Sequence, residues 1–213
     1  MTTVTVACSS NSSPTIASRT SESPAASPTV TAPTPLPDSG DIPPGTYATN
    51  LQPKMTFTAA SVWEVDVDTR GWVGMEFPLP DQILGTIGIV RVEKVFDPEL
   101  GGKLIDPPKD LAGWIGKLRG LEMVAPPTPV TVGGIEGEQL DVLIGPENVE
   151  VGPIPGTSDP HNGFPRKHAV RIIVVSVDGQ DVQISFAPDE AGSKHFQAAV
   201  KYVDPLLDSI TWG

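Results

Sequence analysis

Three side chains that could perform acid–base or metal chemistry lie close together between residues 159 and 168. Asp159 precedes His161 by two residues, and His168 follows a little further along the chain. A carboxylate beside a histidine can orient the imidazole as a general base, and the same three side chains could ligate a metal ion. This spacing offers a small hydrolase as one hypothesis.

The sequence around these histidines favours a plainer interpretation. Residues 145–165 hold five prolines and several glycines, which is typical of a solvated surface loop. We therefore expect no catalytic residue and no metal ligand here. Long loops on rigid sheets often carry binding residues, so His161 and His168 remain candidates for contact with a ligand.

Tryptophan side chains offer a second kind of site. Trp63, Trp72 and Trp114 could line a sugar- or lipid-binding groove, or each could fill the core. Helical spacing places Trp114 on one face with Leu111 and Leu118, which favours the core for that residue. Trp72 is therefore the third candidate ligand-binding residue, because polar groups converging on it would indicate small-molecule binding.

Motifs for several common chemistries are missing. The chain has no Gly-x-Ser-x-Gly serine motif, and the segment 101–103 lacks the upstream glycine and the following Ser or Thr of a phosphate-binding loop. We therefore expect no cofactor. The net charge of −12 repels phosphate backbones, so nucleic acid is not an expected partner either.

The single cysteine, Cys8, stands directly before a segment that is very rich in Ser, Thr and Pro. Between Ser9 and Pro37, 19 of 29 residues belong to these three types, and few large apolar side chains are available to form a core. We therefore expect residues 1–45 to be a truncated signal remnant and a disordered tether. The pair Ala7-Cys8 resembles the cleavage site of bacterial lipoproteins, which implies a membrane anchor through a lipid on Cys8.

Regular patterns begin after Pro43-Pro44-Gly45. Alternation of apolar and polar residues predicts strands, and a spacing of three and four residues predicts two helices. Asp178-Gly179 predicts a tight hairpin turn. The expected strands cover 55–59, 63–67, 73–77, 87–92, 131–144, 169–177 and 182–186, and the expected helices lie within 106–118 and 188–210. We therefore expect one α+β domain over residues 46–213, with an antiparallel sheet flanked by helices.

The order of these elements resembles that of PsbP-like domains. The resemblance rests on an early strand leading from Phe57 to Trp63, a following strand hairpin, and a C-terminal helix that leads into 207–210. It implies an α/β/α sandwich over roughly residues 46–213. Proteins of that fold differ in function, so the resemblance assigns no site.

Together these patterns predict a non-enzymatic, extracytoplasmic lipoprotein of the cell envelope. Its domain would be displayed on a flexible stalk and would bind a protein, a small ligand or a cell-wall component. Two alternatives stay open. One is a small extracytoplasmic hydrolase that uses Asp159 with His161 or His168, and the other is an intracellular protein with a disordered N-terminus.

Overall fold

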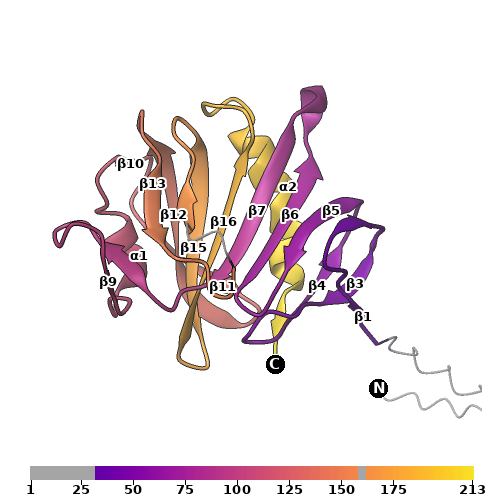
Figure 1. Ribbon diagram of the computed structural model, residues 1–213. Coiled ribbons are helices and arrows are strands. Elements are labelled where there is room, and N and C mark those ends of the chain that lie inside the picture. Colours follow the sequence, from indigo (N-terminus) through magenta and orange to yellow (C-terminus); the bar gives the residue numbers. More distant parts are fainter. Residues whose placement is uncertain (1–31, 158–161) are drawn as a thin grey trace, which may run out of the picture. The chain divides into compact units, whose positions relative to one another are not determined.

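Antiparallel strands form most of the structure. The computed structural model describes residues 32–157 and 162–213. The predicted site residues Cys8, Asp159 and His161, and the predicted tether as far as residue 31, lie outside these ranges. All pairs in the large sheet are antiparallel (Figure 1).

The large sheet has one continuous path of strands and one side branch. Its order is β10 (Leu121–Met123), β12 (Ile135–Ile144), β15 (Ala169–Val177), β16 (Gln180–Pro188), β7 (Leu84–Arg91), β6 (Trp72–Pro78), β5 (Trp63–Asp68) and β2 (Gly40–Ile42). The side branch, β11 (Thr128–Val132), pairs with the first half of β12, while β10 pairs with its last residues.

Smaller elements surround this sheet. A second sheet has the order β1 (Thr34–Pro35), β3 (Gly45–Ala48), β4 (Met55–Ala59) and β17 (Thr211–Trp212). Two hairpins pair β8 (Val95–Asp97) with β9 (Lys103–Ile105) and β13 (Val149–Gly152) with β14 (Asn162–Phe164). The helical elements are α1 (Leu111–Ile115), α2 (Phe196–Ser209) and the 3₁₀ turn η1 (Pro80–Gln82).

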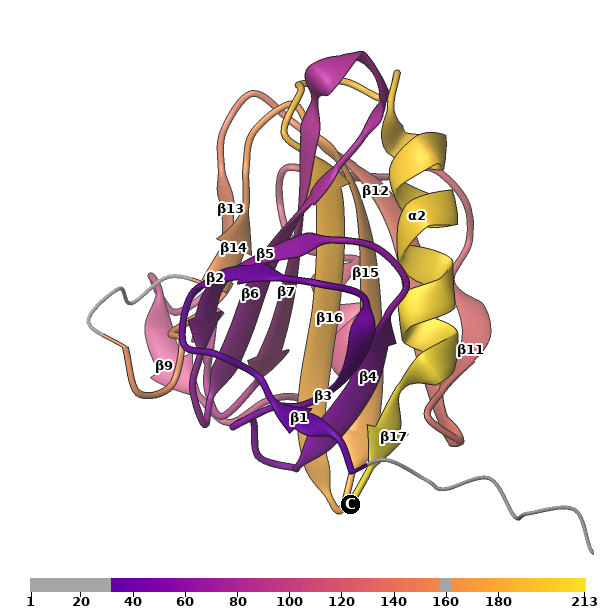
Figure 2. The same cartoon turned by 90° about the vertical axis from the view of Figure 1, so that its right-hand side faces the viewer.

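The two faces of the large sheet carry separate apolar cores. Helix α2 lies along one face of the sheet (Figure 2). Its buried residues share a core with buried residues of β6, β7, β15 and β16, and also with those of β4 from the smaller sheet. On the other face, α1 and the β13–β14 hairpin cover β12 and β15. Strand β15 is therefore buried on both faces, as the apolar run Ile172-Ile173-Val174-Val175 predicts.

The folded part begins earlier than the predicted boundary at Thr46. Strands β1 and β2 lie inside the segment assigned to the tether, and the compact unit starts at Pro33. Leu36 and Ile42 are both buried in the core beside α2. The prediction was wrong here because it relied on the high proline and serine content of this segment and gave too little weight to two aliphatic residues, Leu36 and Ile42, which are buried in the core.

The predicted helix-flanked sandwich is corrected to a mainly β fold. Helix α1 has only five residues, where the sequence predicted a longer helix within 106–118. Asp110 caps its start by accepting a hydrogen bond from the backbone N–H of Gly113 at 2.8 Å, and Gly116 ends it. Gly113 and Gly116 both have low helix propensity, and this weakens a longer helix. The PsbP-like resemblance stays a prediction.

Helix α2 has the predicted spacing of apolar residues and runs through Pro205 without interruption. It begins at Phe196 and not at Pro188, because Pro188 is the last residue of β16. Within the parts of the chain that the structure describes, neither this helix nor any other has the length and apolar character needed to cross a bilayer.

Candidate functional site

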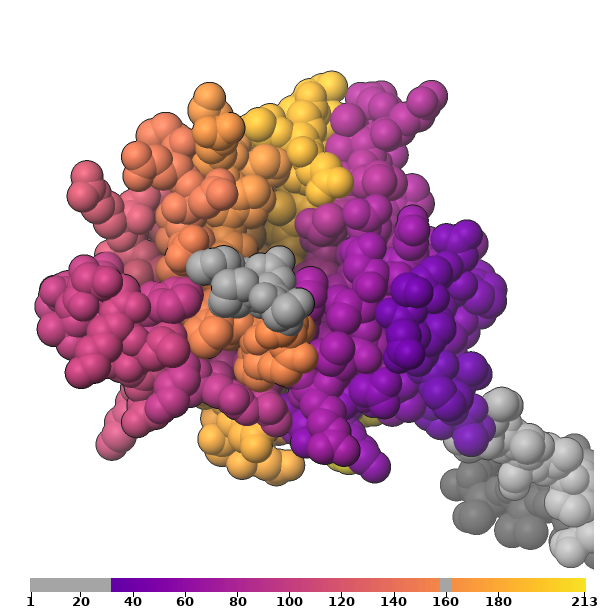
Figure 3. All heavy atoms as spheres, viewed as in Figure 1, coloured from indigo at the N-terminus to yellow at the C-terminus, as the bar shows by residue number. Residues whose placement is uncertain are grey.

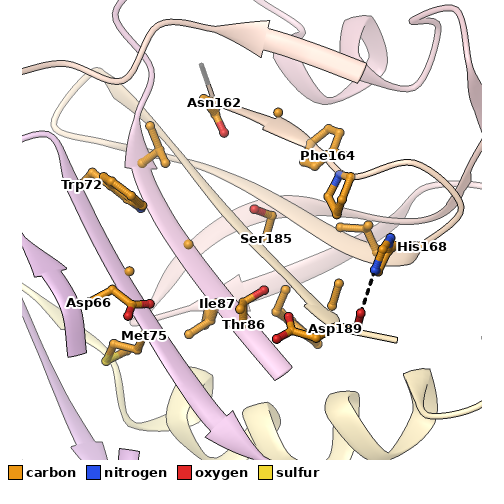
Figure 4. Close-up of a pocket in the computed structure, with 18 of the residues that line it drawn as sticks. Asp66, Trp72, Met75, Thr86, Ile87, Asn162, Phe164, His168, Ser185 and Asp189 are labelled. Atoms are coloured by element: carbon orange, nitrogen blue, oxygen red, sulfur yellow. Dashed lines mark hydrogen bonds between the residues drawn. The ribbon is translucent and has the colours of Figure 1, made fainter. Parts of the chain in front are cut away.

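A pocket of about 250 Å³ opens on the face of the large sheet that lies opposite α2. Its floor consists of β6, β7 and β16, and one wall consists of β14 with the neighbouring residues Ile154 and Pro165 (Figure 4). Figure 3 shows the orange surface of β14 and β15 beside the magenta surface of β6 and β7 on this side of the molecule.

The pocket exists because small residues occupy one row of the sheet. Gly74 on β6 pairs with Gly88 on β7, and Gly88 pairs in turn with Ser185 on β16. Neighbouring rows carry larger side chains, such as Trp72 opposite Val90. Since side chains on one face of a sheet recur at every second residue, this row leaves a hollow between bulkier neighbours.

Trp72 forms a side of the hollow and is half-buried. A Cβ atom added to Gly74 would lie 3.1 Å from Cζ2 of the indole, and one added to Gly88 would lie 3.7 Å from Nε1. The ring therefore extends across both glycines along the floor. The absence of side chains at these two positions is what allows this contact.

Asp66 reaches the pocket through an irregularity in β5. Val65 pairs with Met75 and Val67 pairs with Gly74, so Asp66 is an extra residue between two successive pairs. A bulge of this kind interrupts the alternation of side chains and redirects one of them. Val67 Cγ1 also reaches the floor, at 3.0 Å from a Cβ added to Gly74. Two consecutive residues therefore face the pocket side.

His168 lies at the other end of the pocket and is held by backbone carbonyl groups. Its Nδ1 lies 2.8 Å from the carbonyl oxygen of Arg166, and its Nε2 lies 3.1 Å from that of Asp189 (Figure 4). A carbonyl oxygen only accepts hydrogen bonds, and a neutral imidazole donates through one nitrogen at a time. Neither nitrogen is therefore directed at the pocket as a base.

Buried amides join the wall of the pocket to its floor. Asn162 Nδ2 donates to Gln183 Oε1 at 3.2 Å, and Gln183 Nε2 donates to Asn162 Oδ1 at the same distance. Both side chains are buried. This reciprocal pair fixes β14 above β16, while the hydroxyl-bearing residues Thr86 and Ser185 complete the polar lining.

Carboxylates give this region a negative charge. Burial raises the pKa of Asp66, and the negative charge of Asp189 raises it further. Burial also raises the pKa of Glu76, with additional contributions from three neighbouring carboxylates, among them Asp66 and Asp189. Of the described residues that line the pocket, none is Lys or Arg.

Two of the three candidate ligand-binding residues meet in this pocket. Trp72 and His168 both line it, whereas His161 lies outside the described residues. The other tryptophans are elsewhere, because Trp63 is buried against Phe77 and Trp114 packs against the core around α1. Among the described residues, no group of three or more His, Cys, Asp or Glu side chains could hold a metal ion.

Sequence reasoning missed several lining residues: Asp66, Thr86, Asn162, Ser185 and Asp189. A usable signal was present in β7 and β16. Thr86, Gly88 and Ser185 are small or polar residues at positions that share a face, in strands whose other face is apolar. That pattern could have indicated a hollow above the sheet.

The described parts of the segment 145–165 have more regular structure than the predicted loop. They contain β13 and β14, and Val149, Val151 and Phe164 are buried in the core around α1. The prediction was wrong because it weighed the prolines and glycines above the alternation of Val149 and Val151, which supplies the apolar face of a short strand.

Comparisons with known proteins identify no family for this chain. No family model matches it. No curated protein matches it. Solved structures do match, and one of them is the crystal structure of LpqN, a protein involved in cell envelope biogenesis of Mycobacterium tuberculosis. That match covers 81% of this chain and 90% of LpqN, with 12% sequence identity and a TM-score of 0.33. A TM-score this low carries no argument about function.

Proposed function

We propose that this domain is a non-enzymatic binding module that takes a small ligand into the pocket beside Trp72. The observation that supports this most is the combination of an aromatic wall, a glycine floor and several polar side chains around one cavity. Ligand pockets characteristically combine an apolar lining with a few placed polar groups. The volume of about 250 Å³ suits a small molecule or one group of a larger one.

The hydrogen bonds of His168 favour binding over hydrolysis. A general base needs a free nitrogen within reach of the proton that it removes. Both nitrogens of His168 instead lie within hydrogen-bond distance of backbone carbonyls. In the alternative hydrolase, Asp159 would act with His161 or His168. Asp159 and His161 lie outside the described residues, and the hydrogen bonds of His168 suit a structural role for its imidazole.

We further propose that the module is extracytoplasmic and belongs to the bacterial cell envelope. This part of the proposal depends on the sequence alone. Cys8 with the Ser-, Thr- and Pro-rich segment behind it would provide a lipid anchor and a stalk. The negative charge of the chain suits a domain held away from anionic headgroups.

Binding can be tested on the full chain by recording amide NMR spectra against a library of small fragments. The expected shifts are concentrated at residues 72–75, 86–90, 162–168 and 185–189, and Trp72→Ala removes them. Trp114→Phe is the matched control, because it changes a tryptophan outside the pocket and is expected to keep the shifts. Fragments that shift other regions only, or that bind Trp72→Ala equally well, would contradict the proposal.

The proposed location has its own test. Mass spectrometry of the protein isolated from its native cells is expected to find a lipid joined to Cys8 Sγ by a thioether. Cys8→Ser is expected to move the protein from the membrane fraction to the soluble fraction. An unmodified Cys8 would leave the envelope assignment without support.

A further inference from the structure

We infer that the pocket selects ligands that carry a positively charged ammonium group on an apolar body. This inference depends on the proposed function, since it names the class of ligand for the same pocket. It rests on three features of the lining, which are its charge, its aromatic wall and the position of Asp66.

Charge gives the first argument. Asp66 and Asp189 both line the pocket, and His168 is the only described lining residue that can carry a positive charge. Glu76 lies close enough to Asp66, Asp189 and Glu64 to interact with each of them electrostatically. Arg166 and Lys167 are near in sequence, but both side chains are exposed and neither lines the pocket. The lining therefore attracts cations and repels anions.

The neighbouring carboxylates also gain from a bound cation. Burial is the main cause of the raised pKa values of Asp66 and Glu76, and repulsion between neighbouring carboxylates raises both values further. A cation placed among them would stabilise the ionised carboxylates and relieve the repulsion. A neutral sugar could accept and donate hydrogen bonds here, but it would leave that repulsion in place.

Trp72 supplies the second argument. A cation over the face of an indole ring is attracted by the negative charge of the π system, and tryptophan is the best side chain for this interaction. The ring is held across Gly74 and Gly88, so its orientation does not depend on the ligand. The Trp72 side chain is partly buried, which reduces screening by water.

The bulge in β5 supplies the third argument, because it brings a carboxylate into the lining at the same end of the pocket as this ring. Figure 4 shows Asp66 and Trp72 at the same end of the pocket, with Asp189 farther along near Thr86 and His168. An ammonium group can therefore contact the indole while it is paired with Asp66. The apolar body of the ligand would extend toward Ala187 and Phe164, which also line the cavity.

The test uses three probes of nearly the same shape with the full chain at neutral pH and low salt. These are choline, its neutral isostere 3,3-dimethyl-1-butanol, and the anion 3,3-dimethylbutanoate. Glucose serves as a neutral sugar probe. Amide NMR titration is expected to show shifts at the pocket with choline, at least about tenfold weaker binding of the neutral isostere, and no binding of the anion.

Two variants make the result specific to the pocket. Asp66→Asn is expected to reduce the preference for choline over its neutral isostere to less than about threefold. Glu99→Gln, which removes one exposed negative charge on the β8–β9 hairpin, is expected to leave the preference unchanged. If the preference for choline reflected only the net charge of the protein, it would change to the same extent in both variants, and this result would overturn the inference.

Failure of this inference can be distinguished from failure of the proposed function. Equal binding of choline and its isostere, or stronger binding of the anion or of glucose, would overturn the preference for cations while leaving a small-molecule pocket. No shift with any probe up to about 50 mM, where weak millimolar binding is detectable, would also overturn it. The fragment library then decides separately whether the pocket binds small molecules at all.

Discussion

Asn162 and Gln183 satisfy each other's amide groups through two hydrogen bonds of 3.2 Å, although they lie on different sheets. Gln183 is fully buried, and Asn162 is nearly so. Among the described residues, no other side-chain hydrogen bond joins the β14 wall of the pocket to its β16 floor. The shape of the pocket therefore depends on a buried polar pair.

Replacing both members of this pair should destabilise the protein by less than the sum of the two single replacements. Gln183→Leu leaves the Asn162 amide without its partner, which is expected to lower the free energy of unfolding by about 1–3 kcal/mol. The double replacement of both residues by Leu removes both buried amides, so its loss is expected to be smaller than the sum of the single losses. Urea unfolding of the four proteins measures this, and strictly additive losses would contradict the reciprocal pairing.

Arg171 should contribute far more to stability than an exposed cation does. It faces Asp141 on the neighbouring strand, with Nε and Nη2 each 2.8 Å from one carboxylate oxygen, and it lies over the ring of Phe196 at 6.0 Å. Arg171→Ala leaves a largely buried carboxylate without its partner and is expected to cost roughly 2–3 kcal/mol.

The matched control for Arg171 is Lys94, whose ion pair with Asp106 is exposed. Lys94→Ala is expected to change the free energy of unfolding by about 0–1 kcal/mol. Thermal and urea unfolding compare the two variants. Similar losses of unfolding free energy in the two variants would show that the ion pair between Arg171 and Asp141 contributes no more than the exposed pair.

Asp68 should make the free energy of unfolding decrease as the pH rises from acidic to neutral. Burial raises its pKa from 3.8 to about 6, the backbone N–H of Asn50 partly offsets this by donating to both carboxylate oxygens, and the charge of Asp38 adds a smaller rise. A raised pKa means that folding favours the protonated acid. Its stabilising contribution is therefore full below pH 3.8 and is lost as the pH rises through about 6.

Comparison with Asp68→Asn isolates this effect. The difference in unfolding free energy between wild type and variant is expected to change by roughly 1–3 kcal/mol between acidic and neutral pH, with the wild type relatively weaker at neutral pH. Asn keeps an oxygen that can accept from Asn50 but does not ionise. A difference that stays constant with pH would contradict the raised pKa.

Filling the glycine floor should abolish binding without harming the fold. A Cβ on Gly88 meets only Trp72 Nε1 and Ser185 Oγ, at 3.7 and 3.8 Å, which are ordinary contacts. Gly88→Ala therefore adds one methyl group to the floor of the pocket without a close contact, and it is expected to change the free energy of unfolding by less than about 1 kcal/mol. Loss of the pocket NMR shifts with unchanged unfolding would support the assignment.

Gly137 provides the contrast. A Cβ at this position would lie 2.3 Å from the carbonyl oxygen of Val174 on the adjacent strand. Gly137→Ala is expected to lower the free energy of unfolding by roughly 1–3 kcal/mol, since backbone must move to make room. Equal free energies of unfolding for the Gly88 and Gly137 variants would mean that β12 and β15 do not approach each other at Gly137 as closely as this structure shows.

Local sequence patterns predicted the parts of the fold that depend on near neighbours. Asp178 and Gly179 both have positive φ angles, as the predicted hairpin turn requires. Helix α2 and the both-sided burial of β15 are likewise confirmed. In each case the signal lies within one element, in its period or in the two residues of a turn.

The site was less predictable because it is assembled from distant segments. The bulge at Asp66 depends on how β5 registers with β6, and period alone cannot reveal an extra residue. The Asn162–Gln183 pair depends on β14 lying over β16. Trp72 and His168 were recognised as candidates from their chemistry, but only the three-dimensional arrangement places them around one cavity.

The small sheet joins the two ends of the folded part, since β17 pairs with β4 and the indole N–H of Trp212 donates to the carbonyl of Val132 at 3.0 Å. During synthesis, β4 leaves the ribosome long before Trp212 is made. The growing chain therefore cannot complete this sheet until Thr211 and Trp212 have been synthesised.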